Sequence, residues 1–394
     1  MNAPTPEHIV GQLEAAACEL SKRHAVSGCD PDPFPAWAEL HRLPQWLERA
    51  RDAAVQADPD ATKAAEWLLD NDYQVERAVR QIEEGLPAKF YQNLHSLTTA
   101  EEKGLPRVFV VAHGLLQASR LQLSLSSAVQ FVRAYQETAP LTIAELWAFP
   151  TMLRLACLEI LVAAFARLFP DVALPFAPSH CAVCVGPFDD TESVARAIAN
   201  LGVIASIQWK DFFESTSQVE AILRRDPAKV YPRMDFETRD RYRQGVEVLA
   251  RGSRQSEWAV AGALLAQSSA SSPEPPRDHV GYWLLGDGRK TFETALKYRP
   301  PPMVRCRQWF MRHAGPLYLA AILAAGLGGL ILPAFYLWGV GASPALWVLG
   351  IALTLLPAWG LGLTLAHWIV TLIVPPRILP KLDFTKAVPP DCAT

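Results

Sequence analysis

The sequence lacks any strongly basic or acidic region, and its formal net charge is −3 over 394 residues. Nucleic-acid binding needs Lys and Arg side chains gathered on one face, and no window of the sequence supplies them. Residues 1–30 also lack the apolar stretch of a signal peptide, because charged residues are spread through them. We therefore expect no nucleic-acid partner and an N-terminus that is not exported.

Cysteine is scarce and scattered. Seven cysteines, an odd number, do not form the pattern of a disulfide framework, which favours a reducing compartment. One Cys-x-x-Cys pair, Cys181 and Cys184, follows His180, but no second pair completes a tetrahedral zinc site. We therefore predict no metal site, with a metal or redox role for this pair as the alternative.

Catalytic motifs are missing as well. The sequence has no glycine-rich phosphate loop after a strand, no Gly-x-Ser-x-Gly and no His-Glu-x-x-His. It also lacks the Asp-rich motif and the strand–helix alternation typical of nucleotide-sugar transferases. The sequence therefore predicts no catalytic residue and no bound cofactor.

What the sequence does have is two long apolar runs near its end, at residues 317–340 and 345–374. As a helix at about 1.5 Å per residue, the first run is roughly 36 Å long, enough to cross a hydrocarbon core of about 30 Å. A short turn at residues 341–344 joins the runs. We predict a transmembrane hairpin over residues 316–375, with a buried core hairpin of a soluble protein as the alternative.

Basic residues flank the hairpin on both sides, and its turn has none. The positive-inside rule therefore predicts that both chain termini are cytoplasmic, including a tail at residues 376–394. Residues expected at the membrane interfaces are Tyr336, Trp338, Trp347, Arg312 and Arg377.

Glycines, two prolines and one histidine interrupt the two predicted spans. Pro333 and Pro357 are expected to kink their helices. His367 is expected to have an interfacial or helix-packing role, with a place in an intramembrane pathway as the alternative. Close approach of the two helices is expected at Gly326, Gly328, Gly329, Gly350, Gly360 and Gly362.

The preceding region is predicted to be helical: an extension with a flexible joint over residues 1–60, and a domain over residues 61–267. A linker with a short extended segment follows over residues 268–315, in which residues 279–285 are a candidate strand. Helices are expected at residues 124–138, 191–201, 209–225, 236–251 and 253–267. The predicted fold class is all-α, a helical cytoplasmic bundle followed by a two-helix transmembrane hairpin.

Thr142 and Glu145 form a capping box that predicts the start of a long apolar helix, which Pro150 is expected to kink or break. Charged residues interrupt this helix, and each would cost about 2.5–3.5 kcal/mol at the centre of a bilayer. We therefore predict a buried central helix, with a third membrane span as the alternative.

A charge-rich helix follows residue 234, with opposite charges spaced four residues apart. Such pairs usually lie on a solvated face, and a partner-docking face is the alternative. The candidate docking residues are Asp235, Glu237, Arg239, Arg241 and Arg243.

Several strings resemble the N-terminal region of bacterial cyclic β-1,2-glucan synthases: residues 65–71, 85–87, 105–109, 139–154, 230–243 and 279–284. The resemblance runs in order from about residue 60 to the end. It implies an inner-membrane enzyme with a cytoplasmic helical region, several spans, a transferase domain that uses a nucleotide sugar, and a phosphorylase-like domain. The transferase is expected to begin after the hairpin, so no catalytic residue is carried over.

The leading hypothesis is therefore a membrane-anchoring portion of such a synthase, in a bacterial inner membrane. Its expected partners are the lipid bilayer and a separate glycosyltransferase or phosphorylase chain. The alternatives are a stand-alone membrane scaffold or regulator with a helical docking domain, and a chain that is itself an enzyme.

Overall fold

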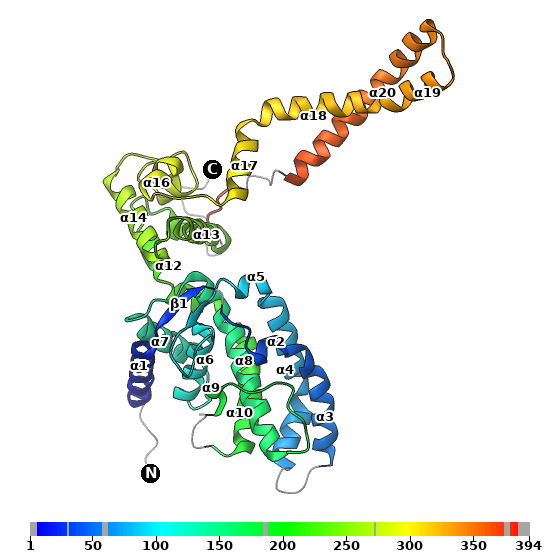
Figure 1. The fold of residues 1–394 in the computed structure, drawn as a ribbon. Helices are drawn as coiled ribbons and strands as arrows, with labels where there is room; N and C mark the ends of the chain where they lie inside the picture. Colours follow the sequence, from blue (N-terminus) through cyan, green and yellow to red (C-terminus); the bar gives the residue numbers. More distant parts are fainter. Residues whose placement is uncertain are drawn as a thin grey trace. The chain divides into compact units, whose positions relative to one another are not determined.

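A computed structural model describes residues 6–29, 31–56, 62–183, 188–271, 273–373 and 379–384 of the protein. Helices make up most of these residues (Figure 1). Strands β1 (Val26–Cys29) and β2 (His95–Leu97) pair antiparallel and form the two-stranded sheet of this part of the chain. The predicted all-α class is confirmed.

The chain forms two compact units that are interleaved in sequence. Unit 1 comprises Met1–Lys229 and Glu257–Val280, and unit 2 comprises Val230–Ser256 and Gly281–Thr394. The chain therefore passes from one unit to the other three times. The predicted domain boundaries near residues 60, 267 and 315 stay predictions.

Helix α8 (Ile143–Leu168) lies at the centre of unit 1, where α4 (Thr62–Gly85), α6 (Arg107–Ala118) and α10 (Asp190–Ser206) pack against it. Its 18 most apolar consecutive residues are all buried, including the charged Glu159 at 0% exposure. The prediction of a buried central helix is confirmed, because protein rather than lipid surrounds this segment.

The start of α8 follows the predicted capping box. The Thr142 hydroxyl accepts a hydrogen bond from the Glu145 backbone N–H, and the Glu145 carboxylate accepts one from the Thr142 N–H. Pro150 lies inside the helix without ending it, so the break considered at this position is absent. Packing on every side of α8 offsets the backbone hydrogen bond that proline cannot donate.

Around this centre, α1 (Pro6–Arg23) packs on α6 and on α7 (Leu125–Gln136). α3 (Leu43–Val55) packs on α4, and α12 (Gln218–Leu223) packs on α14 (Glu257–Ala270). Shorter helices complete unit 1: α2 (Pro35–Ala38), α5 (Ala88–Tyr91), α9 (His180–Val183) and α11 (Trp209–Thr216).

The helix predicted at residues 209–225 is two helices in the structure. Ser217 has an extended backbone conformation, and its hydroxyl accepts a hydrogen bond from the Glu220 N–H, which caps α12. Serine readily bonds to nearby backbone groups in this way, so it favours a helix start over a helix interior. The prediction of one continuous helix was wrong at this residue.

The candidate strand at residues 279–285 is instead helix α15 (Val280–Leu284). The buried carboxylate of Asp226 accepts a hydrogen bond from the Val280 N–H at 3.0 Å and lies 2.8 Å from His279 Nδ1. A distant residue therefore supplies the N-terminal partner of this helix, and the local sequence pattern does not contain that information.

Unit 2 begins at Val230 with a 3-10 helix (Tyr231–Arg233), and α13 (Phe236–Ser253), whose N-cap is Asp235, follows. It continues after α15 with α16 (Arg289–Ala295), α17 (Pro302–Arg312), α18 (Ala314–Gly329), α19 (Ile331–Gly339) and α20 (Pro344–Ile373). After α20 the chain returns to the start of α13: the Asp235 N–H donates to the Lys381 carbonyl at 3.0 Å, and the Asp383 N–H donates to the Arg233 carbonyl at 2.8 Å.

Candidate functional site

The hairpin of α18, α19 and α20 is the most distinctive surface of the chain. Ala314–Gly339 and Pro344–Leu372 are each long and apolar enough to cross a membrane, and α18 packs along α20. Ile143–Leu168 also meets this criterion, but its apolar window is 100% buried, against 11% for each hairpin helix. Of these three helices in the described part of the chain, only the two of the hairpin leave most of their apolar surface uncovered by protein.

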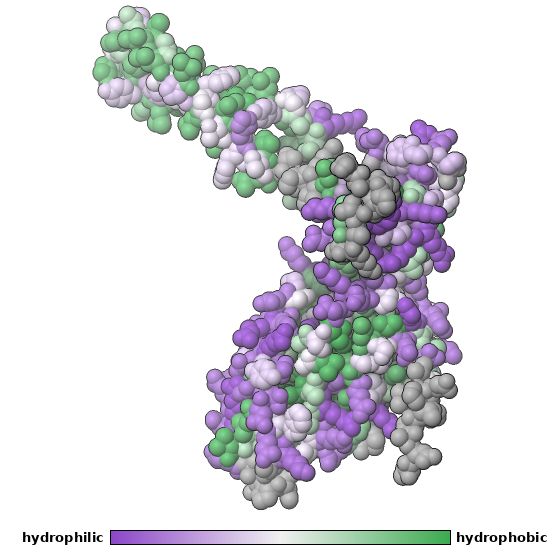
Figure 2. Space-filling model, turned by 180° about the vertical axis from the view of Figure 1, so that it is seen from behind, coloured by the Kyte–Doolittle hydropathy of each residue, from purple (hydrophilic) through white to green (hydrophobic). Residues whose placement is uncertain are grey.

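Large apolar side chains project outward along the hairpin. Leu332, Phe335 and Leu356 are 80%, 74% and 81% exposed, and Figure 2 shows hydrophobic residues gathered over this arm. Contacts with water at this surface would cost about 25 cal/mol for each Å² of apolar area. Soluble monomers rarely expose apolar patches beyond a few hundred Å². The hairpin therefore requires an apolar environment.

Glycines allow the hairpin helices to approach closely. A Cβ at Gly362 would lie 2.7 Å from the backbone nitrogen of Gly326, and one at Gly350 would lie 2.8 Å from Leu337. Gly329 faces Ala358 in the same way, whereas Cβ atoms at Gly328 and Gly360 would meet no atom within 4 Å. The predicted close approach is confirmed at Gly326, Gly329, Gly350 and Gly362, and was wrong at Gly328 and Gly360.

The prolines affect the two arms differently. The first arm is interrupted at Leu330, between α18 and α19, three residues before Pro333. Proline has no N–H and crowds the preceding turn, which accounts for the interruption. Pro357 lies inside α20, which continues through it.

His367 contacts the opposite helix. Its Nε2 lies 2.5 Å from the Tyr318 hydroxyl, and the two rings stack with centroids 5.8 Å apart. The contact joins α20 to α18, as the predicted helix-packing role requires.

The residues predicted at the membrane interfaces lie at the ends of the hairpin. Tyr336 and Trp338 are 69% and 76% exposed near the turn, and Trp347 is half-buried at the start of α20. Arg312 is exposed at the end of α17, where the chain enters the hairpin. Arg377 lies outside the described residues.

The five candidate docking residues do not share one solvated face. Arg239 is 8% exposed and Arg243 is fully buried, with its guanidinium 4.7 Å from the centroid of the Phe236 ring. The Asp235 side chain caps α13. Of the five residues, only Glu237 and Arg241 remain, and they are exposed and half-exposed. The two arginines share the buried stripe of α13 with Tyr242, Val246 and Leu249, and charge spacing alone could not reveal this.

Sequence reasoning missed a buried polar cluster in unit 1. The Arg107 Nε donates to Glu145 Oε1 at 2.8 Å, and its Nη2 donates to Glu145 Oε2 and to the Pro140 carbonyl. Nearby, His24 Nδ1 lies 2.7 Å from the Tyr135 hydroxyl. The residues come from four separate segments of sequence, so no local motif could have revealed the cluster. It links α6 to the start of α8 and has a structural rather than a chemical role.

Electrostatics in this cluster favour charged Glu145 and neutral His24. Burial raises the pKa of Glu145, but the adjacent Arg107 guanidinium outweighs it and holds that pKa below its ordinary value. Burial, together with the positive charges of Arg23 and Arg107, lowers the pKa of His24 to about 4. The histidine is therefore neutral near pH 7.

A second cluster lies beside the predicted Cys-x-x-Cys pair. The Ser179 hydroxyl donates to Glu159 Oε2 at 2.6 Å, and His113 Nε2 lies 3.1 Å from the same oxygen. Both groups bond to the carboxylate rather than to each other, which is not the order of a serine–histidine–acid relay. Cys181 is half-buried and Cys184 lies outside the described residues. No group of three metal-ligating side chains exists within the described part of the chain.

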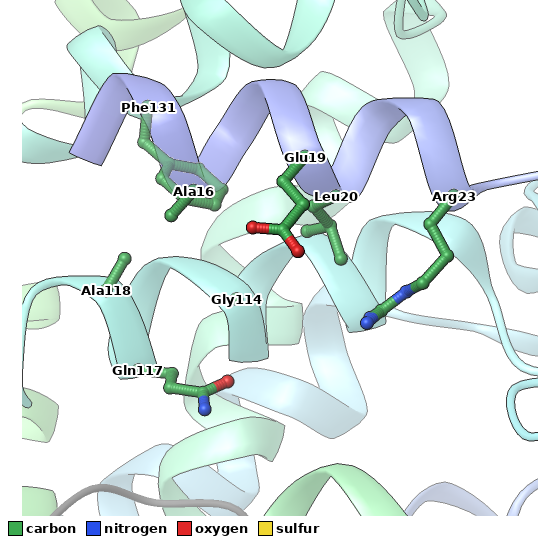
Figure 3. Close-up of a pocket in the computed structure, with 8 residues that line it drawn as sticks. All are labelled: Ala16, Glu19, Leu20, Arg23, Gly114, Gln117, Ala118 and Phe131. Carbon is green, nitrogen blue, oxygen red and sulfur yellow. The ribbon is translucent and has the colours of Figure 1, made fainter. Parts of the chain in front are cut away.

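A shallow hollow of about 310 Å³ lies between α1 and α6 (Figure 3). Glu19 and Arg23 reach from α1 towards α6, and Arg23 pairs with Glu102 at 2.9 Å. A Cβ at Gly114 would lie 2.7 Å from Leu20, so direct helix packing closes the floor of the hollow. We find no chemical role for it.

Comparison with known proteins gives one informative match, and no family model matches the chain. The chain is 25% identical to the cyclic beta-(1,2)-glucan synthase NdvB of Rhizobium meliloti (strain 1021), over 98% of its own length. It spans only 16% of the length of that protein. The predicted resemblance to cyclic β-1,2-glucan synthases is therefore confirmed, and so partial a match is consistent with the N-terminal region of such an enzyme.

Proposed function

We propose that this chain is the membrane-anchoring portion of a cyclic β-1,2-glucan synthase. In this proposal the hairpin spans a bacterial inner membrane with both chain ends in the cytoplasm. Unit 1 is then a cytoplasmic helical domain. A nucleotide-sugar transferase, supplied by sequence beyond these 394 residues or by a separate chain, makes the glucan.

The observation that carries the proposal is the contrast between the apolar helices. The apolar stretch of α8 is fully buried within the protein, whereas α18 and α20 pack mainly on each other and expose their remaining apolar surface. A helix has no unpaired backbone groups along its middle, so a helical hairpin is suited to the hydrocarbon core. The similarity to NdvB supports the link to glucan synthesis.

Membrane insertion is tested by expressing the full chain in bacteria and washing the membranes with alkaline carbonate. The chain should stay in the pellet. A double variant, Leu327→Arg with Leu356→Arg, should shift it towards the supernatant, because each charge within the hydrocarbon region costs about 2.5–3.5 kcal/mol. The matched control is Leu174→Arg with Leu285→Arg, at exposed leucines outside the hairpin. Release of the wild-type chain by carbonate would refute insertion.

Orientation is tested with single cysteines. One variant keeps only Cys306, which precedes the first predicted span and is exposed. Another has all native cysteines replaced and carries Ser343→Cys in the turn. A membrane-impermeant maleimide added to spheroplasts should label residue 343 and should label residue 306 only after permeabilisation. The reverse pattern would overturn the predicted orientation.

The partnership with a transferase is tested by affinity purification of the tagged chain from detergent-solubilised native membranes. A glycosyltransferase or phosphorylase chain should copurify, and deletion of this chain should reduce cyclic glucan production. Unchanged glucan production together with no copurifying transferase would contradict the proposal. The alternative of a scaffold docking through α13 is less favoured, because Arg239 and Arg243 are buried.

A further inference from the structure

A basic groove of about 580 Å³ lies in unit 2, between the end of α13 and the segment that joins α16 to α17. Four cations line it, Arg251 and Arg254 from the α13 end and Lys297 and Arg299 from the joining segment. Val248 and Val304 add an apolar part to the wall. The groove therefore presents positive charge beside an apolar surface.

Three of these cations have no carboxylate partner within the described residues. Arg251 pairs with Glu247 at 2.7 Å, but no ion pair or side-chain hydrogen bond involves Arg254, Lys297 or Arg299 there, and all three are exposed. Arg254 and Lys297 also have left-handed backbones, with φ of +57° and +53°. Each of these two residues follows the last turn of a helix, α13 or α16, where a left-handed residue commonly ends the helix, so both cations are fixed at adjoining helix ends.

The Tyr298 side chain also lines the groove. The Tyr298 Oη is buried and has no hydrogen-bond partner in the described part of the chain. Its ring is held in place by Gly252, where a Cβ would lie only 2.0 Å from the ring, and the Arg299 N–H donates to the Gly252 carbonyl at 3.0 Å. A buried hydroxyl without a partner is costly, and an acceptor oxygen in the groove would satisfy it.

The sequence after Glu293, which supplies part of the groove lining, has no acidic residue over a long stretch. No Asp or Glu occurs between Glu293 and Asp383, whereas Arg305, Arg307 and Arg312 follow the groove directly. The acidic side chains Glu247 and Glu293 lie near the lining residues, and each pairs with an arginine.

The groove is also close to the hairpin along the chain. α17 begins next to the groove-lining residue Pro301 and ends two residues before α18, a helical length of roughly 16 Å. Trp309, Phe310 and Met311 on α17 are about half-exposed among its arginines. Exposed aromatic and basic side chains on one short helix are typical of the headgroup layer of a membrane.

From these observations we propose that the groove binds the phosphate headgroup of an anionic phospholipid of the same membrane. Arg254, Lys297 and Arg299 pair with the phosphate oxygens, the Tyr298 hydroxyl donates a hydrogen bond, and Val248 and Val304 contact the start of the acyl chains. The inference rests on the proposed membrane insertion. A free phosphate would use the same cations but would leave the apolar wall and the exposed apolar side chains of α17 without a role.

The test uses the full chain purified in neutral detergent, with bound lipids counted by native mass spectrometry. Phosphatidylglycerol is titrated against phosphatidylcholine with the same acyl chains. We expect a preference for phosphatidylglycerol. Arg254→Gln, Lys297→Gln and Arg299→Gln combined should weaken phosphatidylglycerol binding by about tenfold or more, since each charge near an anionic headgroup contributes roughly fivefold.

A matched control combines Lys63→Gln, Lys89→Gln and Lys103→Gln, which remove the same charge from exposed sites in unit 1 and should leave lipid binding unchanged. Tyr298→Phe changes neither charge nor backbone and should weaken binding by a few fold, so the test does not depend on folding of the triple variant. Equal binding by the groove variants and the control variant would overturn the proposal. Displacement of the lipid by an equal concentration of inorganic phosphate would reassign the groove to a free anion.

Failure of this inference is separable from failure of the proposed function. A chain that resists carbonate extraction from neutral phosphatidylcholine vesicles, yet shows no preference for phosphatidylglycerol, supports insertion and refutes the lipid site. A chain that does not insert at all refutes both.

Discussion

The buried ion pair between Arg107 and Glu145 allows a quantitative test of what holds unit 1 together. Glu145 is 0% exposed and Arg107 is 5% exposed, and two guanidinium nitrogens donate to the two carboxylate oxygens. Glu145→Gln keeps the size of the side chain and can still accept a hydrogen bond from the Thr142 N–H. It removes the charge, however, and leaves the Arg107 guanidinium buried without a counter-ion.

Removal of one partner from a buried pair typically costs about 3–5 kcal/mol, because desolvation of the remaining charge is no longer compensated. For a unit of this size each kcal/mol lowers the melting temperature by about 2–4 °C. We therefore expect Glu145→Gln to lower the melting temperature of unit 1 by roughly 6–20 °C. Thermal unfolding of the full chain in detergent, followed by far-UV circular dichroism, measures this fall in melting temperature.

Two further variants complete the experiment. Arg107→Met combined with Glu145→Gln should cost less than the sum of the single variants, because the double variant buries no unpaired charge. Glu39→Gln is the matched control: Glu39 pairs with Arg42 at 3.0 Å on the surface, and its loss should cost less than about 1 kcal/mol. A loss of less than about 1 kcal/mol for Glu145→Gln, or additive costs in the double variant, would refute the reasoning.

Two other predictions concern protonation and helix packing. In the unfolded chain His24 has a pKa of about 6.5, whereas in the folded chain burial and the charge of Arg23 lower its pKa to about 4. Between these two values the unfolded chain binds a proton that the folded chain does not bind. The stability of the fold is therefore complete above pH 6.5 and declines as the pH falls towards 4. His24→Gln should therefore flatten the fall of the melting temperature between pH 7 and 4.5, and an unchanged slope would contradict this assignment. Gly362→Leu should separate the hairpin helices, because its side chain would collide with the Gly326 backbone, whereas Gly360→Leu points into open space and should be tolerated. Crosslinking between cysteines placed in α18 and α20 measures the separation, and equal crosslinking in both variants would argue against this interface.

Features set by neighbouring residues could be predicted from the sequence. The capping box of Thr142 and Glu145 starts α8, Asp235 caps α13, and the two uncharged runs form long helices. Each depends on side chains within a few residues of the backbone groups that they satisfy, or on uniform composition over a whole helix. Such information is present in the local sequence.

Features set by tertiary contacts could not be predicted. Helix α15 depends on a carboxylate of Asp226, more than fifty residues earlier in the sequence. The burial of Arg243 depends on which stripe of α13 faces the core. The basic groove brings together the end of α13 and the residues before α17, and neither segment alone indicates an anion site. In each case the partner lies elsewhere in the chain.

The first turn of α8 is bonded by a residue that is synthesised much later, because the two units alternate along the chain. The N–H of Ile143, in the first turn of α8, donates to the Glu257 carboxylate at 2.7 Å, and this acid belongs to the segment made after α13. A fragment that ended at residue 229 would contain the whole of the central helix but not the acid that binds its first turn. Nascent unit 1 therefore completes its folding only after part of unit 2 has left the ribosome.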